Sequence, residues 1–121
     1  MTANSILTGL EPENIIDDPY PYIAVPNALE PAYYQELAAA FPSLERIAGQ
    51  KLLANNKAYR LPACEVLADP AIPRIWREFF EYHCSGQFLQ ECIAFWQTAI
   101  EQEYPVIEDW FGKPLAQLVV F

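Results

Sequence analysis

The chain has 121 residues, which is the length of one ordinary domain. Hydrophobic residues make up 53% of it and charged residues 19%, a composition that excludes a disordered chain. A net charge of −9 argues against nucleic acid and anionic membranes as partners, because both are bound through cationic side chains.

Residues 1–16 have no strong hydrophobic period and predict a flexible lead before a helical region that spans residues 17–114. The segment 17–22 carries two prolines, whose rings hold the backbone in an extended turn. Residues 22–25 then have the character of a short strand, which Pro26 and Asn27 end.

A first helix is predicted over residues 30–41. Pro31 suits the first helical turn, where its missing N–H has no helical partner to lose, and Pro42 stops the helix. Its apolar face is expected to hold Tyr33, Leu37, Ala40 and Phe41. The stretch that follows, residues 43–68, has the least regular pattern of the chain.

A second helix is predicted to begin near Asp69 and Pro70, with Asp69 as its N-cap, or at Pro73. It ends where Ser85 and Gly86 break the pattern. Its apolar stripe comprises Ile72, Ile75, Trp76, Phe79, Phe80 and His83. Trp76 lies at the centre of this stripe, so we expect it to be buried between the second helix and the next one.

A third helix is predicted over residues 87–103, and Pro105 ends it. Its apolar stripe comprises Leu89, Cys92, Ile93, Trp96 and Ile100, widened by Phe88 and Phe95. Residues 106–111 predict a short helical turn with Gly112 just past its end. Residues 115–121 predict the start of a strand, and we expect the native reading frame to continue past it.

The chemistry-bearing residues form no recognisable catalytic or metal site. A zinc site needs about four ligands, commonly cysteine or histidine at short spacings, whereas the chain has one histidine and three scattered cysteines. Cys64 and His83 as a nucleophile–base pair is a minor alternative. The favoured interpretation makes Cys64, Cys84 and Cys92 small buried hydrophobes and His83 a residue at the edge of the core.

Other candidate motifs are also weak. The acidic pairs Asp17-Asp18 and Glu108-Asp109 fall in polar turns or at exposed helix positions, which favours solvation over acid–base catalysis. No glycine-rich phosphate loop is present. Aromatic residues at helical spacing predict core packing.

The basic residues are concentrated in one window, which holds Arg46, Lys51, Lys57 and Arg60. A loop with Lys57, Tyr59 and Arg60 can contact a substrate or another anion through charge-assisted hydrogen bonds. The alternative is that these cations pair with the surrounding acids. These three are the only contact residues that we predict.

Several segments together resemble a known family. The stretch DPYPYIAVPNAL (residues 18–29), a helix ending at Phe41-Pro42, the run WREFFEYHCSGQF (residues 76–88) and then Phe111-Gly112 follow one another. In this order they resemble the opening of bacterial Fe(II)/2-oxoglutarate-dependent oxygenases of the prolyl-hydroxylase-like group. The resemblance covers residues 17–112.

The resemblance implies a dioxygenase whose double-stranded β-helix (jelly roll) carries His-x-Asp/Glu, a distal histidine and an arginine for 2-oxoglutarate. No position here matches those motifs, so the expected fold class is mainly α with short β segments. Such a helical N-terminal part would pack on a jelly roll that this chain does not contain. Fe(II) and 2-oxoglutarate are implied for an intact parent, and none is expected to bind this chain, which would be inactive alone.

Two other functions stay open. The chain can be a self-contained helical module that binds a protein through an aromatic groove. A cysteine enzyme using Cys64 is a third possibility. The first basic residue is Arg46 and no apolar run approaches the ~20 residues of a membrane span, so neither a secretion signal nor a membrane segment is expected. With an odd number of cysteines, this predicts a cytoplasmic protein.

Overall fold

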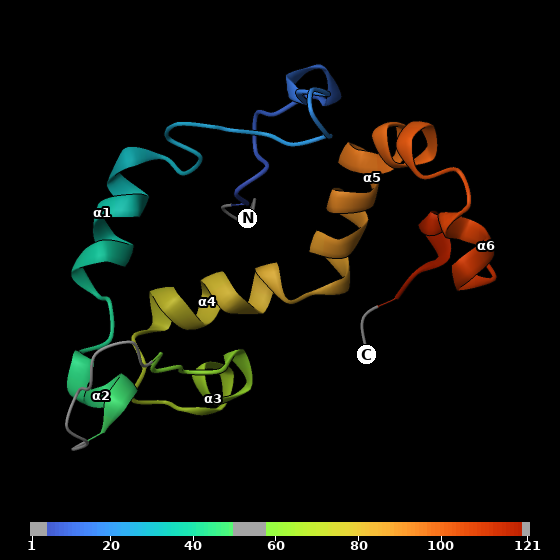
Figure 1. The fold of residues 1–121 in the computed structure, drawn as a ribbon. Helices are drawn as coiled ribbons and strands as arrows, with labels where there is room; N and C mark the ends of the chain where they lie inside the picture. The colour runs from blue at the N-terminus through green and yellow to red at the C-terminus, as the bar shows by residue number, and fades with distance from the viewer. Residues whose placement is uncertain (1–4, 50–57, 120–121) are drawn as a thin grey trace. The chain divides into compact units, whose positions relative to one another are not determined.

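The computed structural model describes residues 5–49 and 58–119 (Figure 1). The elements in chain order are η1 (Pro12–Asn14), α1 (Pro31–Ala39), α2 (Leu44–Ala48), α3 (Ala63–Ala68), α4 (Arg74–His83), α5 (Gly86–Glu103), α6 (Ile107–Phe111) and η2 (Leu115–Gln117). Within those ranges no strand forms, and the β-type pairing is an isolated antiparallel bridge between Ile16 and Tyr22. The prediction of a mainly α chain is confirmed.

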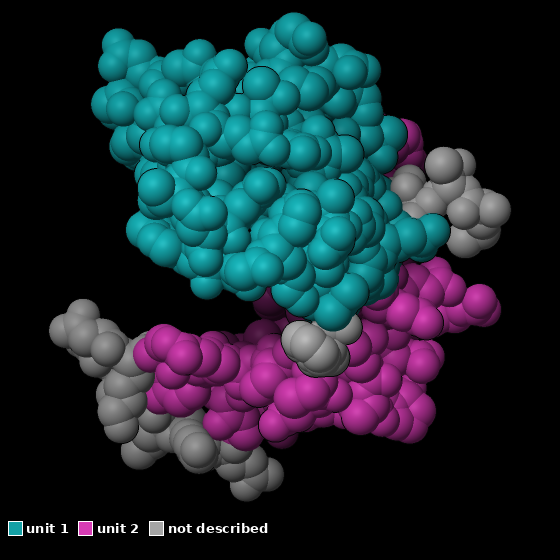
Figure 2. Space-filling model, turned by 90° about the vertical axis from the view of Figure 1, so that its right-hand side faces the viewer, with its two compact units in different colours: residues 1–29, 82–121 teal, residues 30–81 magenta. Residues whose placement is uncertain are grey.

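The chain divides into two compact units (Figure 2). One comprises Met1–Leu29 together with Tyr82–Phe121, and the other is the continuous segment Glu30–Glu81. We call them the terminal unit and the central unit. The sequence predicts a single domain or an N-terminal fragment and gives no sign of this division.

In the central unit, α1 follows the predicted pattern. The Glu30 carboxylate accepts hydrogen bonds of 3.1 Å from the backbone N–H groups of Ala32 and Tyr33, which supplies partners for two N–H groups of the first turn. Pro31 occupies the first turn, as predicted. Leu37 is the buried residue of this helix, with 4% of its surface exposed.

Two short helices lie inside the segment predicted to be least regular. The Ser43 hydroxyl accepts a hydrogen bond of 3.1 Å from the backbone N–H of Arg46 and begins α2, and Gly49 ends it with a positive φ of 67°. Pro62 precedes α3, whose Val66 is buried. Helices of five or six residues span fewer than two turns, which is too short for a hydrophobic period to be recognised in the sequence.

The second predicted helix begins at the later of its two predicted positions. Pro73 precedes α4, and its carbonyl accepts from the N–H of Trp76 at 3.0 Å and of Arg77 at 3.2 Å. The start at Asp69 is wrong, because Asp69 ends α3 and its carboxylate accepts from the N–H of Ala71 at 2.8 Å. That bond closes a local turn of the kind aspartate favours.

In the terminal unit, the predicted third helix is confirmed as α5. The Ser85 hydroxyl caps it by accepting from the N–H of Phe88 at 3.1 Å. Its buried residues are Ile93, Phe95 and Ala99. Ile93 belongs to the predicted stripe, whereas Phe95, two positions further on, lies on nearly the opposite side of the helix, so α5 is buried on two sides.

The strand predicted at residues 115–121 is not found in its described part. Leu115–Gln117 is a single 3-10 turn, and the side chain of Gln90 in α5 donates to the backbone carbonyls of Ala116 at 3.4 Å and Leu118 at 3.1 Å. Leu115 is buried, with 4% exposed. These bonds hold the segment against α5, and residues 120–121 lie outside the described ranges.

The other strand prediction, over residues 22–25, is also wrong. Of these residues only Tyr22 pairs with Ile16, and the residues that follow it form no further β-bridges.

The short helical turn before Gly112 is confirmed as α6, and Gly112 takes the left-handed conformation at φ 71°. Within the predicted lead, Ser5 and Leu7 are buried, with 4% and 8% exposed.

Candidate functional site

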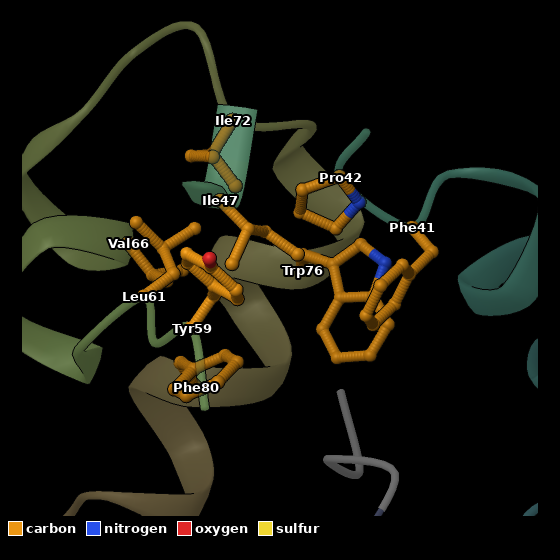
Figure 3. Close-up of a pocket in the computed structure, with 9 residues that line it drawn as sticks. All are labelled: Phe41, Pro42, Ile47, Tyr59, Leu61, Val66, Ile72, Trp76 and Phe80. Carbon is orange, nitrogen blue, oxygen red and sulfur yellow. The ribbon is translucent and has the colours of Figure 1, made fainter. Parts of the chain in front are cut away.

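The central unit contains a pocket of about 210 Å³ (Figure 3). We call it the aromatic pocket. Its lining residues come from the loop after α1, from the loops before α3 and before α4, and from α2, α3 and α4. They are Phe41, Pro42, Ile47, Tyr59, Leu61, Val66, Ile72, Trp76 and Phe80.

Trp76 organises one wall of the aromatic pocket. Its ring lies edge-to-face with Phe41, at a centroid distance of 5.6 Å and an interplanar angle of 78°, and with Phe79 at 5.8 Å and 71°. Figure 3 shows Trp76 and Phe41 next to each other, with Leu61 and Val66 across the pocket. Trp76 was predicted to be buried between the second and third helices, but its side chain is half-buried and lines this pocket.

Two of the described lining side chains, Trp76 and Tyr59, carry polar atoms. The indole N–H of Trp76 donates a hydrogen bond of 2.8 Å to the backbone carbonyl oxygen of Leu37, and Tyr59 also has an interaction partner. The other lining side chains within the described ranges are hydrocarbons. The walls therefore offer shape and apolar surface to an occupant.

Two arginines are direct sequence neighbours of lining residues: Arg46 precedes Ile47, and Arg77 follows Trp76. Arg46, next to Ile47, pairs with Asp69, and the Arg77 guanidinium donates to the backbone carbonyl of Ile72 at 3.0 Å. The backbone N–H of Ala71 holds the pKa of the Asp69 carboxyl below its usual value, and Arg46 adds to this effect against the opposing effect of burial. For Arg46, pairing with a surrounding acid is thus what the structure shows.

The three residues predicted to contact an anion are not brought together in one described site. Tyr59 lines the aromatic pocket and Arg60 is exposed. Lys57 lies outside the described residues. The anion contact stays a prediction, and the structure adds that Tyr59 belongs to an apolar wall.

The cysteines are less buried than predicted. Cys64 and Cys84 are exposed and Cys92 is half-buried, and all three are free thiols. The interpretation of Cys64 and Cys84 as buried hydrophobes is therefore wrong. Burial, followed by the Glu91 carboxylate, raises the pKa of the Cys92 thiol, which lowers the fraction of it present as the nucleophilic thiolate.

The terminal unit contains a polar cluster that no pattern in the sequence indicates. The Glu91 carboxylate in α5 accepts hydrogen bonds from the Ser5 hydroxyl and from the Tyr82 phenol. His83 accepts from the backbone N–H of Ile6 at 3.2 Å and packs its ring on Phe88 at 4.7 Å. The cluster fastens the start of the chain to residues more than 70 positions away.

These contacts confirm His83 as a half-buried residue at the edge of the core. The Glu91 hydrogen bond, with a smaller effect from burial, raises the pKa of the Tyr82 phenol.

The predicted solvation of Asp17, Asp18 and Asp109 is confirmed, since all three are exposed. Glu108 is half-buried, and its carboxylate accepts from the backbone N–H of Leu115 at 3.2 Å.

The residues of this chain do not fit the iron site of a 2-oxoglutarate oxygenase. That site takes two histidines and a carboxylate, and the sequence has one histidine. Over residues 5–49 and 58–119, no group of three or more histidine, cysteine, aspartate or glutamate side chains is arranged to hold a metal ion.

No helix of the described ranges is long and apolar enough to cross a membrane. Comparison of the chain with protein-family models, with curated proteins and with solved structures gave no match. The functional argument therefore depends on the residues and on their arrangement.

Proposed function

We propose that this chain is the helical region of an Fe(II)/2-oxoglutarate-dependent oxygenase. The observation that carries the proposal is the order of the family-like segments along residues 17–112. The proline and glycine residues in these segments coincide with the ends of helices. Phe41-Pro42 follows α1, Ser85-Gly86 joins α4 to α5, and Phe111-Gly112 closes α6.

In this proposal the chain is a packing surface and not a catalyst. The metal-binding motif would belong to a jelly-roll barrel, since one histidine cannot supply it. Large apolar side chains in the terminal unit support the need for such a partner: Tyr104, Trp110 and Phe111 are 49%, 75% and 50% exposed.

A cytoplasmic location belongs to the same proposal. Free thiols that stand exposed at Cys64 and Cys84 are expected in a reducing compartment, where disulfides are rare. A periplasmic or secreted location would leave both thiols open to oxidation.

The experiment compares two lengths of the protein under anaerobic loading with Fe(II) and 2-oxoglutarate, followed by exposure to O₂. The protein made from the complete native gene should convert 2-oxoglutarate to succinate, and the 121-residue chain should not. A complete protein that leaves 2-oxoglutarate unchanged and binds no Fe(II) would overturn the proposal.

The second candidate is a self-contained helical module that binds a protein. The aromatic pocket favours it, because the chain already forms an apolar recess with residues of its own. A self-contained module should be monomeric, melt cooperatively and bind little hydrophobic dye. A region that needs a barrel should instead bind dye strongly through its exposed apolar side chains.

A further inference from the structure

We infer that the aromatic pocket is a binding site for a small, uncharged hydrophobic molecule of one or two fused rings. The inference is independent of the proposed function, because the nine lining residues that the structure describes lie in the central unit of this chain.

The chemistry of the walls selects an apolar occupant. The indole N–H of Trp76 is committed to the Leu37 carbonyl, which leaves the Tyr59 hydroxyl as the other polar side-chain group among the described lining residues. A polar ligand that entered would give up hydrogen bonds to water and find hydrocarbon walls in return, which is unfavourable. Among the described residues of the lining there is no aspartate, glutamate, lysine or arginine to compensate a charge.

The volume sets the size of the occupant. Dry apolar cavities of about 150 Å³ in proteins bind benzene, whereas drug-sized ligands occupy roughly 300 Å³ or more. At about 210 Å³ the aromatic pocket lies between these values. One ring, or two fused rings, matches that space.

The aromatic residues favour a planar ligand. Phe41 lines the pocket and yet is 60% exposed, so an occupant would cover apolar surface that now meets water. Trp76 and Phe80, with centroids 6.1 Å apart, add two more rings to the walls. Planar rings pack on such walls edge-to-face or in offset stacks.

The test is a titration of the isotope-labelled 121-residue chain with indole, followed by NMR. We expect saturable shifts of the Trp76 indole N–H and of the Ile47 and Val66 methyl groups, with a Kd on the order of 0.1–1 mM for so small a ligand. Uracil, which is flat but polar, should give no saturable shift. Shifts centred on the exposed Trp110, or no saturation with indole, would overturn the inference.

Matched variants locate the site by a second route. Val66→Phe and Ile47→Phe each place a ring in the pocket and should weaken indole binding at least about tenfold. Leu67→Phe in α3 and Leu44→Phe in α2 are the controls, because both positions are exposed and outside the lining. Equal binding by a folded pocket variant, or an equal loss in its control, would contradict the inference. If both pocket variants unfold, the shift map of the unaltered chain decides.

Discussion

The indole N–H of Trp76 in α4 donates a 2.8 Å hydrogen bond to the backbone carbonyl oxygen of Leu37 in α1. Leu37 lies in the last turn of α1, where carbonyl groups lack partners within the helix. The neighbouring carbonyls of Glu36 and Ala38 accept from the N–H groups that follow the helix. The Trp76 side chain thus completes the C-terminal end of α1 and joins it to α4.

Substitution of Trp76 should separate its two contributions to the free energy of unfolding. Trp76→Phe removes the hydrogen bond, keeps a ring, and should cost about 1 kcal/mol. Trp76→Ala should cost about 2–3 kcal/mol, less than the ~3–5 kcal/mol of a fully buried tryptophan, because the side chain is half-buried. Urea denaturation measures both values. A cost below about 0.5 kcal/mol for Trp76→Ala would contradict the packing described.

Tyr82 should make the stability of the fold depend on pH in the alkaline range. Its bond to Glu91 raises the phenol pKa above the ordinary value of 10.0, so the folded state binds more protons than the unfolded state there. This stabilisation is complete below pH 10 and is lost as pH rises through the folded pKa. Tyr82→Phe should flatten that decline, while Tyr104→Phe, at an exposed position, should leave it unchanged.

Asp69 should make the stability of the fold depend on pH in the acidic range. The Ala71 N–H, with Arg46, lowers the pKa of this carboxyl below 3.8, so its stabilisation is complete above that value and is lost as pH falls through the folded pKa. Asp69→Asn should lower the melting temperature at pH 7 and weaken its fall in acid. Asp109→Asn, at an exposed position, is the control, and equal effects of both variants would contradict the role of Asp69.

The three thiols should react at different rates. Cys92 is half-buried and its pKa is raised by burial and by Glu91, so at pH 8 it carries less thiolate than an exposed cysteine. We expect iodoacetamide to modify Cys92 at least about tenfold more slowly than Cys64 and Cys84. Mass spectrometry of peptides over time gives the three rates, and a fastest rate at Cys92 would contradict this order.

The long helices could be predicted from the sequence because their signals are local. Pro31 and Pro42 bracket α1, and Ser85 caps α5 within three residues of its start. The strand prediction at residues 115–121 failed for a non-local reason: side-chain bonds from Gln90 hold the segment after Pro114 against α5. A bond across more than 20 positions leaves no trace in a hydrophobic pattern.

The candidate site was only partly predictable. Trp76 and Phe80 stand out as members of an apolar stripe, but the pattern assigned them to a closed core. Tyr59 and Leu61 come from a loop with no period, and they reach the pocket only through the fold. The cluster around Glu91 was missed for the same reason, since Ser5 is 86 positions away.

The most direct measurement of the central claim is the sequence of the native gene around this segment. The proposal predicts that the same frame encodes short alternating strands with a His-x-Asp or His-x-Glu motif, then a second histidine, then an arginine shortly after. Such a frame would supply the iron ligands that a single histidine cannot. A native frame that carries no such motifs would contradict the oxygenase proposal and favour the self-contained module.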